Sequence, residues 1–295
     1  MVVKPIIKWV GGKTQILNKL YESFTKILEN KPLDNYYEIF LGGGSVLLAL
    51  LSWIQNGQLQ VSKDFKIFAY DINKTLVHMF INARDKPQEL YDTILPMIEY
   101  YNSVDEKSKE AYYYSLREYY NSVNEVHFKE IGVSAMFIFL NKTGFRGLYR
   151  EGPSGYNVPF GHYKNPEILN YEHLMEVSKL IKNVIFEVAS FETSLNIENN
   201  TGVNLVYLDP PYAPENKKSF TKYTRNDFTL SSHEMLFKMC DNLKIPFIMS
   251  NSYVEMVKEH FDNNEKYSVE TIECKRSINS KDPGSKTMEV LIYKK

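Results

Sequence analysis

The stretch LVYLDPPYAP (205–214) joins residue types that could bind a flat nitrogen base. Asp209 offers a carboxylate at the end of an apolar run, Pro210 and Pro211 keep carbonyl acceptors but lack backbone N–H groups, and Tyr212 offers an aromatic face. The exocyclic amine of a nucleobase could give its two hydrogens to Asp209 and the Pro210 carbonyl while its ring stacks on Tyr212. A simple Pro–Pro turn after a strand explains the prolines but not the flanking residues.

The glycine-rich sequence LGGGS (41–45) lies between another apolar run and a helical pattern. Glycines there would let a ligand approach the backbone at a helix N-terminus. Asp71 ends the next apolar run, where a carboxylate can accept hydrogen bonds from ribose hydroxyls. The alternative for Asp71 is a cap on the helix that follows. Together these features predict a nucleotide-like ligand at the glycine turn and at the end of the next strand along the chain.

The sequence GGKT (11–14) resembles the end of a phosphate-binding P-loop, G-x-x-x-x-G-K-[ST]. The opening glycine of that motif would fall at position 7, which is Ile7. Pro5 also interrupts the only stretch that could form the preceding strand. The sequence therefore argues against a nucleoside triphosphatase, and Lys8, Trp9 and Lys13 need another role.

Composition narrows the class of protein. The chain has 295 residues, 43% hydrophobic and 24% charged, which is typical of a globular protein rather than a disordered or fibrous one. Cys240 and Cys274 are too far apart for a metal motif or a disulfide framework. With no apolar run near the ~20 residues of a membrane span and no signal peptide, we expect a cytoplasmic protein, or one in the nucleoid or nucleus with DNA. The net charge of −1 means that a nucleic acid would be held by local basic patches.

Alternating strand and helix patterns predict an α/β fold with a parallel sheet. Apolar strand patterns occur within residues 35–40, 65–71, 183–191, 203–208 and 245–252, and the end of the chain, 268–295, has the pattern of a hairpin. Residues 85–135 are helical in spacing, charged and rich in tyrosine. In residues 141–166, two strand-like pieces, LYR and YNVPF, flank a turn at residues 153–155. We expect residues 85–166 to be an insertion into the sheet domain.

The order of motifs along the chain resembles that of the DNA adenine N6-methyltransferases of the Dam type, the alpha group of the D12 class. The motifs are KWVGGK, YEIFLGGGS, YDIN, NKTGFRGLYR, NVPFGHYKNP, LDPPY, MSNS and KRSINS, and they cover nearly the whole chain. The resemblance implies a Rossmann-like, S-adenosylmethionine-dependent catalytic domain in residues 1–84 and 167–295. It also implies an inserted helical and hairpin subdomain for target recognition in residues 85–166.

The resemblance further implies a methyl donor, S-adenosylmethionine, which becomes S-adenosylhomocysteine, and no metal. It assigns catalysis to Asp209, Pro210, Pro211 and Tyr212. It assigns cofactor contacts to Trp9, Lys13, Glu38, Phe40, Gly42, Gly44, Asp71, Phe191 and Asp209. Ser190 stands where such enzymes commonly have an aspartate, so the acceptor for the cofactor's adenine amine is expected to be weaker.

For DNA binding, the resemblance selects Lys8, Arg146, Leu148, Arg150, Pro159, Tyr163 and Arg276. Arg150 is expected on a guanine, since arginine on O6 and N7 is the commonest base-specific contact, although it could be a plain surface arginine. Pro159 would contact a thymine methyl and Tyr163 a phosphate. Arg146 departs from the neutral amide of well-known members. Arg276, in a loop with Lys275 and Lys281, is expected to grip phosphates.

The predicted function is methyl transfer from S-adenosylmethionine to N6 of a flipped-out adenine in double-stranded DNA, within a short palindrome such as GATC. A monomer is expected, and a restriction endonuclease that cuts the same site is a candidate partner. The same chemistry on an RNA base or a protein amide stays open. The other alternative is a non-catalytic DNA-binding regulator, against which the intact DPPY and GGGS sequences argue.

Overall fold

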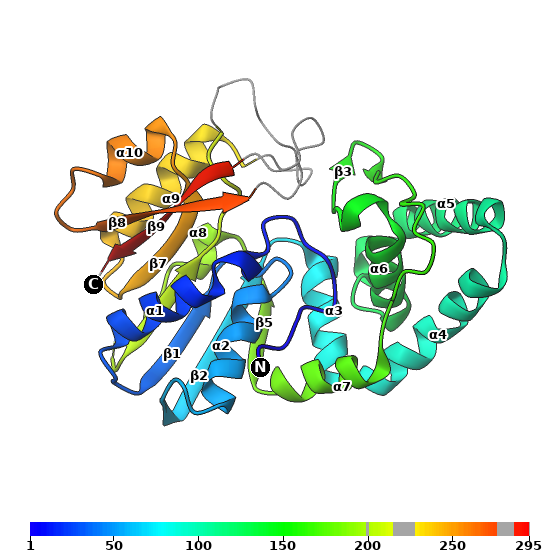
Figure 1. Ribbon diagram of the computed structural model, residues 1–295, viewed down its shortest axis with the longest axis horizontal. Coiled ribbons are helices and arrows are strands. Elements are labelled where there is room, and N and C mark those ends of the chain that lie inside the picture. Colours follow the sequence, from blue (N-terminus) through cyan, green and yellow to red (C-terminus); the bar gives the residue numbers. More distant parts are fainter. Residues whose placement is uncertain (199–200, 215–227, 276–285, 295) are drawn as a thin grey trace.

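The computed structural model describes residues 1–198, 201–214, 228–275 and 286–294 (Figure 1). Its centre is a seven-stranded sheet in the order β5-β2-β1-β6-β7-β9-β8. The first five strands in that order run parallel, and β9 runs antiparallel to both β7 and β8. The strands are β1 (Leu33–Glu38), β2 (Val61–Asp71), β5 (Val184–Val188), β6 (Asn204–Leu208), β7 (Phe247–Ser252), β8 (Ser268–Lys275) and β9 (Lys286–Lys294). The predicted α/β class, parallel sheet and terminal hairpin are confirmed.

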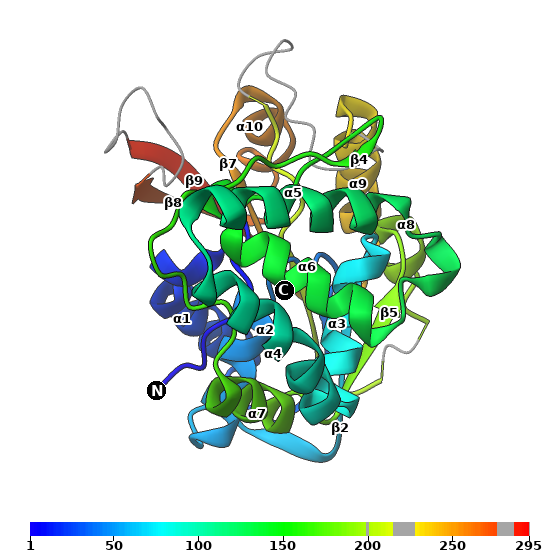
Figure 2. The same cartoon turned by 90° about the vertical axis from the view of Figure 1, so that its right-hand side faces the viewer.

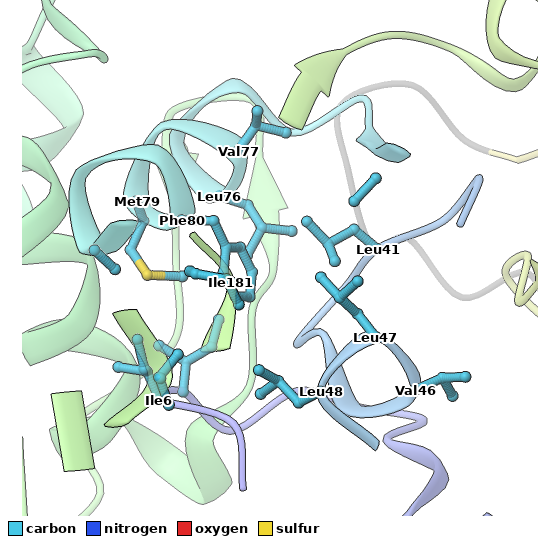
Figure 3. Close-up of a cluster of buried hydrophobic side chains, with 14 of the residues drawn as sticks. Ile6, Leu41, Val46, Leu47, Leu48, Leu76, Val77, Met79, Phe80 and Ile181 are labelled. Carbon is cyan, nitrogen blue, oxygen red and sulfur yellow. The ribbon is translucent and has the colours of Figure 1, made fainter. Parts of the chain in front are cut away.

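Helices cover both faces of this sheet because successive strand residues point to opposite sides. Tyr36 and Tyr207 pack into one hydrophobic cluster, and their neighbours Tyr37 and Val206 pack into the other. The first cluster holds apolar side chains of α1 (Leu17–Leu28), α2 (Ser45–Gln55), α3 (Lys74–Asp85) and α7 (Tyr171–Leu180). The second holds those of α8 (Phe191–Ser194), α9 (Leu230–Asn242) and α10 (Glu255–Phe261). Figure 3 shows part of the first cluster, with Ile6, Leu48 and Phe80 from three separate segments.

A group of three helices stands beside the sheet: α4 (Pro87–Ser103), α5 (Glu106–Ser122) and α6 (Ile131–Thr143) (Figures 1 and 2). Helix α6 is buried almost all round, as expected for a helix that is apolar on every face. It contacts α3 as well as α4 and α5, so the first hydrophobic cluster continues from the sheet into this group. The division into a catalytic and an inserted unit at residues 84/85 and 166/167 stays a prediction.

Residues 141–166, the end of α6 and the loop that follows it, contain a hairpin that is shorter than the sequence predicts. Its strands are β3 (Glu151–Gly152) and β4 (Gly155–Tyr156), preceded by the short helix η3 (Phe145–Gly147). Side chains of α5 hold it: Asn121 exchanges two hydrogen bonds with the Tyr156 backbone, and Arg117 donates to the Val158 carbonyl at 2.9 Å. The backbone pairing continues with one bond, from Asn157 N–H to the Arg150 carbonyl at 3.0 Å, and α5 holds the outer side of the hairpin.

Candidate functional site

The strand ends bring three predicted carboxylates to one edge of the sheet. Strand β1 lies between β2 and β6, with Glu38 opposite Ala69 on one side and Tyr207 on the other. Asp71 ends β2 and Asp209 directly follows β6, so both lie at the carboxyl edge near Glu38. Ligands of open α/β sheets bind at this edge. The N-terminal segment, dark blue in Figure 1, runs between the sheet and the helical group to reach it.

Asp209 pairs with Lys13 from the GGKT sequence. Lys13 Nζ lies 2.7 Å from Asp209 Oδ2 and 4.9 Å from the centre of the Tyr212 ring, and the lysine side chain is only 4% exposed. Asp209 Oδ1 is buried and has no hydrogen-bond partner among the described residues. Burial raises the pKa of Asp209 to about 6, while Lys13 acts to lower it. The site thus holds one neutralised carboxylate oxygen and one open acceptor.

Glu38 is a second buried carboxyl group at this edge. Its Oε2 accepts a hydrogen bond from the Tyr36 hydroxyl at 2.8 Å, and the residue is 1% exposed. Burial raises the pKa of Glu38 to about 8, and the charge of Asp209 adds to the rise. At neutral pH Glu38 therefore holds a proton. A bound cationic ligand would favour the loss of this proton, because positive charge stabilises the ionised carboxylate.

The glycine loop is packed against Trp9. A Cβ atom on Gly42 would lie 2.9 Å from the Trp9 ring, and one on Gly43 would lie 2.7 Å from the Trp9 Cβ. Gly42 has φ 49°, in the left-handed region that favours glycine. Behind Trp9, the Tyr149 ring stacks with a centroid distance of 5.3 Å. The glycines thus allow the loop to pack closely against Trp9, a residue predicted to contact the cofactor.

Asp71 ties the glycine loop to the turn after β2. Its Oδ2 accepts a hydrogen bond from the Gly42 N–H, and its Oδ1 accepts one from the Asn73 N–H, both at 2.9 Å. The cap of α3 is Asn73, whose side chain accepts from Leu76 N–H, so the helix-cap alternative for Asp71 is wrong. Its predicted contact with ribose hydroxyls stays a prediction.

Phe40 and Phe191 lie together with a third ring. Their centroids are 6.1 Å apart, and Phe228 lies 6.0 Å from the first and 5.5 Å from the second. Ser190 immediately precedes α8, with its hydroxyl 3.5 Å from that of Thr193. Phe191 therefore packs against protein rings here, and its contact with a cofactor adenine stays a prediction.

Asn141, near the end of α6, joins Lys8 to the loop that follows that helix. The Asn141 amide accepts from Lys8 N–H at 2.9 Å and donates to the carbonyls of Lys8 and Gly147 at 2.8 and 3.1 Å. Lys8 Nζ lies 4.5 Å from the centre of the Tyr163 ring. Two predicted DNA-binding residues are thus neighbours. The sequence contains Asn141 in a noted motif, but nothing in its type or spacing revealed this bridging role.

The other predicted DNA-binding residues lie along the same loop. Arg146 has φ 56°, is exposed, and places its guanidinium 5.3 Å from the Phe145 ring centre. Arg150 is also exposed; its Nε donates to Asn157 Oδ1 at 2.6 Å and its Nη2 to the Asn157 carbonyl at 3.2 Å. Leu148 is half-buried and Pro159 exposed. Arg276 lies outside the described residues, as does Lys281.

The segment that follows Asp209 is held by residues to which the sequence analysis gave no role. Asn251 Oδ1 accepts from Ala213 N–H at 3.0 Å, Ser252 Oγ donates to the Ala213 carbonyl at 2.6 Å, and the Tyr212 hydroxyl donates to Glu289 Oε2 at 2.7 Å. The polar end of the apolar run IPFIMSNS was a usable signal for the first two. Glu289 gave none.

Two cavities of the described residues, of about 530 and 250 Å³, lie away from the predicted site residues. In the described ranges, no three His, Cys, Asp or Glu side chains gather as metal ligands would. Within the same ranges, no helix has the length and apolar character needed to cross a membrane.

Comparison with known proteins bears on the whole chain. The model of the D12 class N6 adenine-specific DNA methyltransferase family matches residues 9–278. The chain is 36% identical over 287 residues to the type II methyltransferase M.MjaIII of Methanocaldococcus jannaschii, a match that covers 95% of this chain and 94% of that protein. It is 27% identical to the type II methyltransferase M1.LlaDCHI of Lactococcus lactis subsp. cremoris, over 98% of this chain and 95% of that one. It is also 27% identical to the DNA adenine methylase of Escherichia coli (strain K12), over 98% and 94%.

Proposed function

The chain belongs to the D12 class N6 adenine-specific DNA methyltransferase family, and on this premise we propose that it moves a methyl group from S-adenosylmethionine to N6 of an adenine flipped out of duplex DNA. Membership confirms the family and the enzyme class that the order of motifs predicted. The donor, the flipping of the base and the recognition site are the proposed parts.

The observation that carries the proposal is the open acceptor of Asp209. Nitrogen in an aryl amine is a weak nucleophile because its lone pair is delocalised into the ring. Asp209 Oδ1, buried and without a partner among the described residues, and the Pro210 carbonyl would accept the two amine hydrogens and so localise the lone pair. With a pKa of about 6, Asp209 is ionised at neutral pH and can take the proton that N6 loses.

The residues at the sheet edge fit a cationic donor. When bound, S-adenosylmethionine supplies a methyl group on positively charged sulfur. The carboxyl groups of Glu38 and Asp209 lie at adjacent strand ends, where they would bind positive charge and be stabilised by it in their ionised forms. Trp9 holds the glycine loop beside them.

Exposed side chains of residues 141–166, together with Lys8, support duplex DNA as the substrate. Reaching N6 requires the adenine to leave the base stack. Arg150 is held at Nε and Nη2 by Asn157, and none of the described contacts uses its Nη1. This leaves the outer edge of the guanidinium without a described contact, which supports our proposal that Arg150 binds a guanine in a site such as GATC. Names of the type II relatives also support a restriction endonuclease of matching specificity as a partner.

The test is transfer of labelled methyl from S-adenosylmethionine to matched duplexes with and without GATC, followed by detection of N6-methyladenine. An RNA duplex of the same sequence and an Asp209→Ala variant serve as controls. We expect label only on adenine in DNA and only with wild-type protein. Label on RNA alone would support the RNA alternative. DNA binding without transfer would support the non-catalytic regulator.

A further inference from the structure

A hydrogen bond joins Glu289, on a strand that is not adjacent to β6, to the tyrosine of the DPPY sequence. It lies on β9, which is separated from β6 by β7, and it is half-buried. Its Oε2 accepts the hydrogen bond from the Tyr212 hydroxyl at 2.7 Å. The Tyr212 ring is therefore held at both ends, by its backbone at the loop and by its hydroxyl at the sheet.

The backbone of the same loop is already fixed by β7. Asn251, which is fully buried, accepts from Ala213 N–H, and Ser252 donates to the Ala213 carbonyl. With the neighbouring residue held this way, the remaining freedom of Tyr212 is rotation of its side chain. The hydrogen bond to Glu289 removes that freedom.

We propose that Glu289 is a positioning residue that sets the orientation of the Tyr212 ring for stacking on the flipped adenine. The inference rests on the proposed function, which supplies the base. A ring that must find its rotamer on each encounter loses entropy when the base stacks, and a ring fixed in advance does not. Residues that lock the side chains of a site in this way set how well it is preorganised.

The charge of Glu289 also acts on the other carboxylate of the site. Glu289 helps to raise the pKa of Asp209, the carboxylate that must be ionised for the reaction. Burial, and with it the charge of Glu289, also raises the pKa of the Cys274 thiol. Glu289→Gln keeps an acceptor oxygen for Tyr212 but removes the charge, which separates positioning from electrostatics.

The test is a double-mutant cycle on Glu289→Ala and Tyr212→Phe, with kcat and KM for methyl transfer. Loss of a hydrogen bond to a charged group should lower kcat roughly ten- to a hundredfold in either single variant. The double variant should be no slower than the worse single variant, because both remove one interaction. Glu289→Gln should keep most of the activity. Fluorescence of 2-aminopurine placed at the target adenine should report altered stacking in Glu289→Ala and unchanged stacking in Glu289→Gln.

Glu270→Ala is the matched control, since Glu270 lies on the same hairpin and accepts a hydrogen bond from another tyrosine, Tyr293, at 2.9 Å. We expect it to alter melting temperature without altering 2-aminopurine stacking. Equal losses of activity in Glu270→Ala and Glu289→Ala, or additive losses in the double-mutant cycle, would overturn the inference. Normal activity of Tyr212→Phe would also overturn it, even if Glu289→Ala does not fold. An inactive wild type would overturn the proposed function itself, whereas additive losses in an active enzyme would overturn only this inference.

Discussion

The sheet edge and the hairpin loop position their charged side chains in opposite ways. At the edge, Glu38 and Lys13 are buried and Asp209 is half-buried, and burial raises the pKa of both carboxyl groups. In the loop, Arg146 and Arg150 are exposed, and a neighbouring ring or amide only orients them. Burial tunes groups that must change their protonation or bind charge, whereas exposure keeps basic groups fully charged for a polyanionic partner. Substitutions should therefore change turnover at the edge and sequence preference in the loop.

The largest expected effect is on turnover at the edge. Asp209→Ala should lower the rate of methyl transfer by on the order of 10²-fold or more, because the proposed mechanism uses this acceptor in the transition state. DNA affinity, measured by fluorescence anisotropy, should change little. Near-normal turnover by a folded Asp209→Ala protein would break the proposed division of roles.

A second effect at the edge concerns stability. The pKa of Glu38 is raised from 4.5 to about 8 in the folded protein, so the folded state holds the proton more tightly than the unfolded state does. Its contribution to the free energy of unfolding is fully present below the unfolded pKa and is lost as pH rises through about 8. Glu38→Gln cannot ionise, so we expect it to be more stable than wild type at alkaline pH, with little advantage in mild acid.

Urea unfolding at several pH values measures that difference. Glu270→Gln is the control with the opposite sign, because hydrogen bonds from Lys19 and Tyr293 lower the pKa of Glu270. It should lose stability above its unfolded pKa. If the free energy of unfolding of Glu38→Gln and of wild type has the same pH dependence, Glu38 is ionised in the free protein. Burial then does not keep a proton on Glu38.

In the loop, Arg150→Ala should lose about 1–3 kcal/mol of discrimination at one base pair of the site. Turnover on the preferred sequence at saturating DNA should fall less than in Asp209→Ala. Methylation mapping across all variants of the site would show the relaxed position.

Arg276→Ala, a prediction from sequence alone, should instead weaken binding to every sequence and reduce its salt dependence. A relaxed preference in that variant would place specificity outside residues 141–166.

The smallest effect is expected from Asn157→Ala. It removes the acceptor of Arg150 Nε but leaves the guanidinium and the Asn157 backbone carbonyl in place. We expect partial relaxation at the base pair that Arg150→Ala affects, of roughly 1 kcal/mol, which is the usual value of one hydrogen bond. Combining the two substitutions should add nothing further. Relaxation at a different base pair would show that Asn157 contacts DNA on its own account.

The sequence by itself determined the order of strands and helices, the motifs at the strand ends and, through those motifs, the family. These are local properties: a strand shows in a period of two, and DPPY and GGGS are contiguous in the chain. The resemblance carried by these motifs selected Glu38, Asp71 and Asp209, and the structure has them at one edge of the sheet. The hairpin of residues 141–166 was predicted too long: beyond β4, the Val158 carbonyl accepts a hydrogen bond from Arg117 of α5, a contact that local pattern does not reveal.

Only the tertiary structure decided which partners these residues have. The Lys13–Asp209 pair, the Asn141 bridge to Lys8 and the bond from Tyr212 to Glu289 each join segments far apart in the chain. Such contacts depend on strand order and on register, which the type of a single residue does not encode. The raised pKa values of Glu38 and Asp209 likewise come from burial by the assembled fold, since an isolated carboxyl group in water would titrate normally.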